Sequence, residues 1–295
     1  MGIFFNSYNK PGKGIDPDAP QKRSFFRFFD IFFRKFWHFG KTNLLYTLAL
    51  IPTFIILVML MIFPVSTVMG EADQGAELFI VAIILVNLYI SMWGAGPATA
   101  GMTYIMRNFA REEHAWLWSD FKDSFKTNFK QSLAVFVIDI IAAALFYIAI
   151  VVYSQMPGLL GALKYAIYMI IFVYTMMHFY IYPMMVTFEL SLKDLYKNAL
   201  LFALCKLPVN ILVIVILLFI QVGLPVLAIL YGGTYYMLLL FLILMLEMVV
   251  TQAFSAFLVN FSVYPAIKKY MLDVMEKKTN PEDKPGENSE DKGDI

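Results

Sequence analysis

Three ionisable side chains stand within otherwise apolar stretches of the sequence, where they are the residues best placed to do chemistry inside a membrane. They are Asp139, His178 and Glu247. Ionisable groups are costly in hydrocarbon and usually face a bundle interior or a wet cavity. One interpretation is a polar path or binding site for a solute or a proton. The alternative is interhelical hydrogen bonding, which is worth about 0.6 kcal/mol on average in one measured membrane protein.

No catalytic or metal-binding pattern accompanies these three residues. The histidines at positions 38, 114 and 178 are far apart in the sequence, and the single cysteine, Cys205, has no internal partner. Neither a metalloprotease pattern nor a nucleophile motif is present. We therefore expect neither an enzyme nor a metal or cofactor site. The net charge of +1 gives no indication of nucleic-acid binding.

The composition indicates a membrane protein. The sequence is 60% hydrophobic and 15% charged, against about 45–50% and 25% for typical soluble domains. A membrane span needs roughly 20 apolar residues. Six runs meet this requirement, namely Leu44 to Pro64, Leu78 to Thr103, Ser132 to Tyr153, Tyr165 to Thr187, Pro208 to Leu230 and Tyr235 to Val263.

Lysine and arginine are distributed unequally between the connections of these runs. They are frequent before Leu44, between Arg107 and Lys130, between Lys193 and Lys206, and at Lys268 and Lys269, whereas residues 66–77 contain none. Basic connections stay in the cytoplasm. The sequence thus predicts a multi-pass protein of the cell membrane with both termini in the cytoplasm.

Amphipathic segments precede several of the runs. In residues 24–39 a row of phenylalanines opposes a basic face that includes Arg27 and Arg34. A second segment, residues 115–129, carries Trp118, Phe121 and Phe125 on one face and Lys126 on another. A third, from Ser191 to Lys206, begins with a capping pattern. Aromatic and basic faces of this kind suit the membrane interface, so we expect cytoplasmic interfacial helices.

Small residues and prolines mark the returning spans. The second run contains Gly94, Gly96, Pro97 and Gly101, and the fourth and sixth end near Pro183 and Pro265. The small residues either let helices approach closely or break a helix so that its backbone faces a ligand. The recurring prolines are consistent with three repeated hairpins, or with chance, because proline is common in membrane helices.

The predicted fold class is therefore all-α, with six transmembrane helices in three hairpins. Residues 1–43 form a cytoplasmic N-terminal segment, residues 44–272 the transmembrane domain and residues 273–295 a tail. The tail is rich in charged residues, proline and glycine and almost free of apolar ones. We expect it to be disordered, because it cannot bury enough surface to offset the entropy of ordering.

Several short segments, in this order, resemble the YesL-like family of bacterial integral membrane proteins. They are MGIFFN at 1–6, GPATA at 96–100, FKTNFKQ at 125–131, YP at 182–183, TFE at 187–189 and YKNA at 196–199. The family has no established activity, and its genes commonly lie beside carbohydrate uptake systems in Gram-positive bacteria. The resemblance implies an accessory role in sugar uptake and transfers no functional residues.

Two functions remain open from the sequence. In the first, the protein is an accessory or assembly component of a membrane system, whose cytoplasmic aromatic and basic helices contact lipids or carbohydrate transporter subunits. In the second, it is a secondary transporter with a central site at Asp139, His178 and Glu247. The two differ in whether these three residues share a water-accessible cavity.

Overall fold

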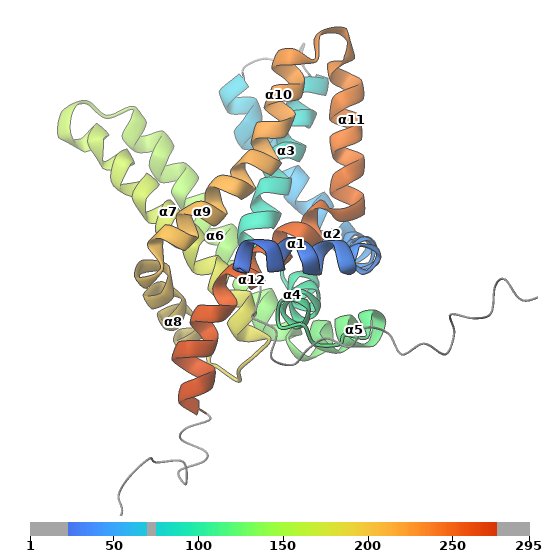
Figure 1. The fold of residues 1–295 in the computed structure, drawn as a ribbon. Coiled ribbons are helices and arrows are strands. Elements are labelled where there is room, and N and C mark those ends of the chain that lie inside the picture. Colours follow the sequence, from blue (N-terminus) through green and yellow to red (C-terminus); the bar gives the residue numbers. More distant parts are fainter. Residues whose placement is uncertain (1–22, 70–74, 276–295) are drawn as a thin grey trace, which may run out of the picture.

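The computed structural model describes residues 23–69 and 75–275, and every element in these ranges is a helix. Long helices diverge from a base of shorter ones (Figure 1). The first half of the chain comprises α1 (Ser24–Arg34), α2 (Phe36–Met69), α3 (Gly75–Trp93), α4 (Pro97–Ala110), α5 (Leu117–Thr127) and α6 (Phe129–Ser154).

In the second half of the chain, short π-helical turns interrupt several of the helices. Its elements are α7 (Gly158–Met185), α8 (Leu192–Cys205), α9 (Leu207–Leu218), η1 (Phe219–Gly223), α10 (Leu224–Tyr231), η2 (Gly233–Tyr235), α11 (Tyr236–Leu246), η3 (Glu247–Thr251), α12 (Gln252–Ile267) and η4 (Lys268–Leu272). Of the four short elements, η2 is a 3-10 turn and the other three are π-helical. The expected disordered tail lies outside the described residues.

Five helical stretches are long and apolar enough to cross a membrane, and a bent pair makes up to six. The five are Phe36–Ile62, Phe129–Ser154, Gly158–Met185, Leu207–Tyr231 and Gly233–Met275. The bent pair consists of Phe79–Trp93 and Pro97–Ala110, which meet at 57°. The run expected as one span from Leu78 to Thr103 is therefore two helices. Consecutive helices α2 and α3, α6 and α7, and α10 and α11 pack in pairs. The three-hairpin repeat stays a prediction.

Helix α4 forms the core of the base. Most of its side chains are buried, from Pro97 through Ala110, and it packs against α2, α5, α6, α7 and α12. Phe121 of α5 covers Gly101, where an added Cβ atom would lie 3.0 Å from the Phe121 ring. The small residues of α4 thus allow close helix packing, as small residues do in membrane proteins.

The residues expected to form a single interfacial helix, 24–39, form two. Helix α1 ends at Arg34, and α2 begins at Phe36. Phe28 of α1 is buried and stacks on Phe257 of α12, with ring centroids 4.9 Å apart, whereas Phe25 and Phe33 are exposed. One face of α1 therefore packs against the bundle and the opposite face remains uncovered.

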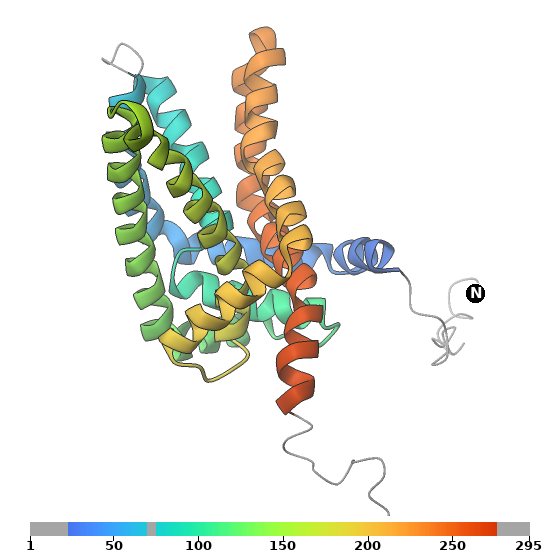
Figure 2. The same ribbon diagram turned by 90° about the vertical axis from the view of Figure 1, so that its left-hand side faces the viewer.

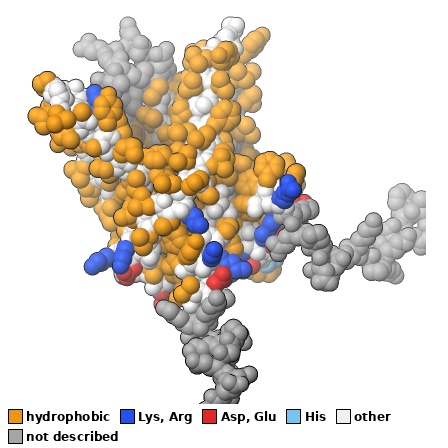
Figure 3. All heavy atoms as spheres, turned by 60° about the vertical axis from the view of Figure 1, so that its left-hand side comes forward, with side chains coloured by type: hydrophobic (Ala, Val, Ile, Leu, Met, Phe, Trp, Pro, Cys, Tyr) orange, Lys and Arg blue, Asp and Glu red, His pale blue; other side chains and the backbone are white. Residues whose placement is uncertain are grey.

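Basic side chains gather at the end of the molecule formed by α1, α4, α5, α8, the start of α9 and η4, which we call the basic end. In Figure 3 the Lys and Arg side chains lie mainly along the lower part of the surface, below a broad hydrophobic region. Away from this end the pairs of helices separate: α6 and α7 diverge from α10 and α11 in Figure 1, and α10 and α11 stand apart from α2 and α3 in Figure 2.

We predict that Gly94→Ala destabilises the protein more than Gly158→Ala. Both glycines have a positive φ angle, 85° and 64°, which costs an alanine about 1 kcal/mol. A Cβ atom at Gly94 would also lie 2.6 Å from the Tyr182 ring, whereas none would meet another atom within 4 Å at Gly158. Crowding of this kind adds about 1–3 kcal/mol.

Thermal unfolding of both variants in the same detergent tests this prediction. Equal decreases in Tm for the two variants would show that the contact with Tyr182 does not fix the conformation at Gly94.

Candidate functional site

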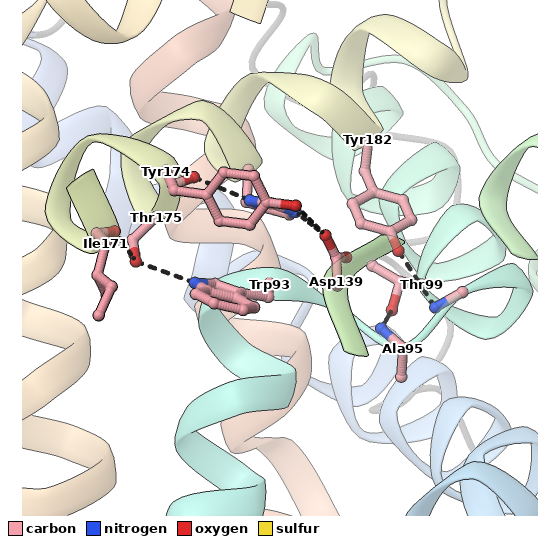
Figure 4. Close-up of polar contacts among 10 residues, drawn as sticks. Trp93, Ala95, Thr99, Asp139, Ile171, Tyr174, Thr175 and Tyr182 are labelled. Atoms are coloured by element: carbon pink, nitrogen blue, oxygen red, sulfur yellow. Dashed lines mark hydrogen bonds and ion pairs between the residues drawn. The ribbon is translucent and has the colours of Figure 1, made fainter. Parts of the chain in front are cut away.

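The chain breaks between α3 and α4 through two glycines and two hydroxyl groups. Gly94 and Gly96 have φ angles of 85° and 69°. The N–H of Ala95 donates to Thr99 Oγ1 at 2.7 Å, and the N–H of Gly96 donates to Tyr182 Oη at 3.1 Å (Figure 4). Side-chain hydroxyls thus replace the carbonyl acceptors that a continuous helix would supply.

This arrangement also leaves carbonyl groups at the end of α3 without helical donors. In a continuous helix the N–H groups of residues 95, 96 and 97 would bond to the carbonyls four residues earlier. Here the first two donate elsewhere, and Pro97 has no N–H. The carbonyls concerned are those of Ser91, Met92 and Trp93.

Two of the three ionisable residues expected from the sequence meet in the structure. Asp139 of α6 and His178 of α7 are buried, with Asp139 Oδ1 2.8 Å from His178 Nε2. The hydroxyl of Tyr174 donates to the same Oδ1 at 2.7 Å. In Figure 4 the Tyr174 and Asp139 side chains point toward each other. Asp139 Oδ2 has no hydrogen-bond partner among the described residues.

The contacts of His178 determine how many protons the pair holds. His178 Nδ1 lies 2.9 Å from the carbonyl oxygen of Tyr174. A carbonyl only accepts, so Nδ1 carries a hydrogen. The contact between Nε2 and Asp139 then needs one further proton, on either atom. The Asp139–His178 pair therefore shares one proton and is neutral overall, either as acid and imidazole or as carboxylate and imidazolium.

Aromatic and hydroxyl groups hold His178 in place. The Trp93 ring stacks on the His178 ring at a centroid distance of 5.6 Å and an angle of 18°. Trp93 Nε1 donates to Thr175 Oγ1 at 2.9 Å, and that hydroxyl donates to the Ile171 carbonyl at 2.9 Å. The last residue of α3 therefore positions a polar group of α7.

Glu247, the third expected residue, belongs to a separate polar cluster. Gln252 Nε2 donates to Glu247 Oε2 at 3.0 Å, and Ser91 Oγ donates to Gln252 Oε1 at 3.0 Å. Gln221 Nε2 in turn donates to Ser91 Oγ at 2.7 Å. Glu247 and Gln221 lie on the π-helical turns η3 and η1, a type of turn that is frequent at functional sites.

Asn43 of α2 satisfies the backbone at η3. Its Nδ2 donates to the carbonyls of Glu247 and Met248, both at 2.8 Å, and its Oδ1 accepts from the N–H of Ala253 at 2.7 Å. A π-helical turn disturbs the regular pairing of the helix backbone. One fully buried amide thus ties α2 to the junction between α11 and α12.

A cavity of about 50 Å³ lies between the two polar clusters. His178 lines it from one cluster, and Gln252 and Ser91 line it from the other. Two further lining groups, Ser255 Oγ and Asn260 Oδ1, are buried without a hydrogen-bond partner in the described part of the chain. The volume suits a few water molecules and is far below the roughly 300–1,000 Å³ of small-molecule sites.

Asp139 and Glu247 do not line this cavity. Glu247 instead borders a crevice of about 350 Å³ between α2, α3 and α11, whose other lining residues are apolar except for Thr47, Asn87 and Gln252. The three ionisable residues therefore do not share one cavity. Asp139 and His178 act as a unit, and Glu247 is connected to that unit only through residues around the small cavity.

The two other prolines expected to mark helix breaks lie inside continuous helices. Pro183 is within α7 and borders the cavity, and Pro265 is within α12. Near Pro183, Thr187 Oγ1 donates to the Pro183 carbonyl at 2.6 Å. This bond does not replace the one lost at the proline, because the carbonyl that Pro183 leaves without a helical donor is that of Phe179.

The expected interfacial aromatic residues divide into buried and exposed groups. Phe121 is 4% exposed and faces α4, and Phe125 is partly buried against the core. Trp118 is 67% exposed and its neighbour Trp116 is 71% exposed, and Lys126 is exposed. An aromatic surface for a partner would therefore consist of the tryptophans and not of Phe121.

Arg27 and Arg34 meet at one carboxylate. Arg27 Nε donates to Glu112 Oε1 and Arg34 Nη2 donates to Glu112 Oε2, both at 2.8 Å. Glu112 has a φ angle of 59°, which is uncommon outside glycine. The hydrogen bond from Arg34, and then that from Arg27, lower the pKa of Glu112 below its ordinary value of 4.5, against an opposing effect of partial burial.

Much of the site comes from residues that the sequence did not single out. Asn87, Gln221 and Gln252 stand out as polar residues in apolar runs, but Trp93, Tyr174 and Tyr182 do not, because tyrosine and tryptophan are common at membrane interfaces. Asn43 lies at the start of an apolar run, where a polar residue is ordinary. Only contacts between helices far apart in the sequence identify these groups.

Comparison with known proteins gives one match. Residues 77–150 match the family model described as "Protein of unknown function, DUF624". No curated protein and no solved structure matches this chain. The matched segment contains the break, α4, α5 and Asp139, and it ends before His178.

We predict that Asp139→Leu destabilises the protein by about 1–2 kcal/mol, because it removes the shared acceptor of His178 and Tyr174 inside a membrane protein. Asp139→Asn keeps an acceptor oxygen and should cost less. Unfolding in detergent measures both losses, with Asp123→Asn as an exposed control. Equal stability of the Leu variant and the unchanged protein would contradict the structural role of Asp139.

We predict that acid loosens α1. A carboxylate whose pKa is lowered on folding contributes stability above its unfolded pKa and loses that contribution as the pH falls through its folded pKa. Hydrogen exchange of residues 24–34, corrected for intrinsic rates, should therefore show less protection at pH 4 or below than at pH 7. In Glu112→Gln the protection should be low at both pH values. A pH response that persists in this variant would assign the effect to another group.

Proposed function

We propose that this protein is an accessory or assembly component of a membrane system, with its basic end in the cytoplasm. Support for the orientation comes from the concentration of Lys and Arg at one end of the helices, because basic segments stay on the cytoplasmic side. Support for the role comes from the way in which the membrane-crossing helices diverge away from that end.

The diverging helices are the observation that carries the proposal. The half of the α6–α7 pair remote from the basic end exposes large apolar side chains, including Leu145, Ile148, Leu160 and Met169. In Figures 1 and 2 the pairs of helices separate from one another away from the basic end. Such surfaces accommodate lipids or the spans of another membrane protein. A transporter would instead be expected to enclose a midplane site between its helices.

The dimensions of the interior support the same proposal. The cavity beside His178, at about 50 Å³, is too small for a sugar. The crevice that Glu247 borders has room for more, but most of its lining is apolar, which suits an acyl chain better than a carbohydrate. The polar clusters then serve to fix the relative positions of the helices.

The system that we propose is carbohydrate uptake. This part of the proposal rests on the resemblance to the YesL-like family, whose genes commonly accompany sugar uptake systems. The contact surface would include the exposed Trp116 and Trp118 at the start of α5. Tryptophans are enriched among the residues that dominate binding at protein interfaces.

A second candidate is a secondary transporter that moves protons. The Asp139–His178 pair shares one proton, and His178 borders the cavity that separates it from the Glu247 cluster. Water in such a cavity would connect the two clusters. In this case Asp139 and His178 would exchange the proton, and Glu247 would accept it on the other side.

We predict that a tagged form of the protein, extracted in mild detergent, co-purifies with carbohydrate permease subunits. Trp116→Ser combined with Trp118→Ser should weaken partner binding about thirtyfold or more and deplete the recovered partner, since loss of each interface aromatic residue costs about 1–2 kcal/mol. Tyr231→Ser with Tyr235→Ser, which removes two exposed aromatic residues from the opposite end, is the matched control. Equal recovery with both double variants would contradict the proposed surface.

Uptake of labelled oligosaccharides separates the two candidates. A strain that lacks the gene should regain uptake when it expresses Asp139→Asn with Glu247→Gln, if the protein is an accessory component. Failure of this variant to restore uptake, while it is present in the membrane at the normal level, would favour the transporter.

A further inference from the structure

A cleft of about 480 Å³ lies at the basic end between α1, α9 and α12. Its lining includes three basic residues, Arg27, Lys206 and Lys269, and no Asp or Glu. We propose that this cleft binds the phosphate of an anionic phospholipid from the adjoining leaflet. The proposal is independent of the accessory role and of the polar clusters.

The two lysines are available to a ligand. Lys206 and Lys269 both lie near the ring of Tyr270, with their Nζ atoms 5.1 and 5.5 Å from the ring centroid. No carboxylate of the described residues forms a salt bridge with either one. Two cations that share one aromatic ring repel each other, so an anion between them stabilises the arrangement.

Arg27 is held in a fixed position beside the lysines. Its Nε donates to Glu112 at 2.8 Å, which orients the planar guanidinium group while the terminal nitrogens remain for another acceptor. The hydroxyls of Ser24 and Ser262 also line the cleft. The cleft therefore combines two lysines that have no salt bridge within the described residues, one arginine paired with Glu112, and neutral donors, a set of groups that suits a phosphate.

The apolar part of the cleft favours a lipid over free phosphate. Val209 and Phe261 line the cleft, and α9 continues from it with the exposed apolar side chains of Ile211, Leu212 and Val215. A phosphate held by the lysines would place the acyl chains along this face of α9. Basic pockets between membrane helices on the cytoplasmic side bind anionic headgroups in this way.

Native mass spectrometry of the full-length protein in neutral detergent tests the proposal. Dioctanoyl phosphatidylglycerol is titrated, and dioctanoyl phosphatidylcholine is the zwitterionic comparison. We expect one saturable phosphatidylglycerol adduct. Lys206→Gln with Lys269→Gln should raise its Kd about twenty-five-fold, because each lysine near an anionic lipid contributes roughly a factor of five.

Two double variants complete the experiment. Lys193→Gln with Lys197→Gln removes the same charge from α8, outside the cleft, and should leave the Kd unchanged. Lys206→Arg with Lys269→Arg keeps the charge and should retain binding, which separates a loss of the site from a loss of folding. If both Gln double variants raise the Kd equally, the effect depends on the overall charge of the protein and not on the cleft, and the proposal is overturned.

Two further results would also overturn it. Phosphatidylcholine binding with the Kd of phosphatidylglycerol would show that the cleft does not select negative charge. Displacement of phosphatidylglycerol by inorganic phosphate at equal concentrations would show that the ligand is a soluble phosphate and that the apolar face of α9 has no part in binding.

Discussion

The interruption between α3 and α4 is the constraint on which the rest of the structure depends. A helix that stops inside an apolar region must find new partners for its backbone groups, and here the hydroxyls of Thr99 and Tyr182 supply them. Tyr182 also packs against Gly94 closely enough that no side chain fits there. The break therefore fixes the position of α7 relative to α3, and it turns α4 by 57° into the interior of the base. A continuous second span would leave α2, α5 and α12 without the helix against which they pack.

The same junction connects the polar residues. Trp93 ends α3 and stacks on His178, which contacts Asp139, and Ser91, two residues earlier, joins the cluster of Gln252 and Glu247. The end of one helix therefore contacts both clusters, with the small cavity between them. The unpaired buried oxygens of Ser255 and Asn260 face this cavity. A buried polar group left without a partner costs about 1–3 kcal/mol, and water in this cavity would supply partners for both oxygens.

The sequence predicted the class of protein and the location of its apolar runs, because hydrophobicity over twenty residues depends on composition alone. It also predicted that Asp139, His178 and Glu247 would be buried, since charge in an apolar run has few other places to go. It did not predict which of them would meet. That depends on the rotation of α6 and α7 about their axes, and the contacts that accompany it come from Trp93 at the end of α3 and from Tyr174 within α7 itself. The burial of Phe121 could not be predicted for a similar reason: the amphipathic pattern of residues 115–129 marks two faces, and only the packing against Gly101 shows which face is covered.

The distribution of polar groups along the molecule indicates where specificity resides. Inside the membrane region the polar side chains mostly bond to one another, so little of their hydrogen-bonding capacity is left for a ligand of appreciable size. The basic end differs, since Lys206 and Lys269 form no salt bridge with a carboxylate of residues 23–69 or 75–275, and Trp116 and Trp118 are largely exposed. The interior therefore fixes the geometry of the helices, and recognition of lipid or protein is expected at the base, where α4 and the Glu112 contacts hold α1 and α5 in position.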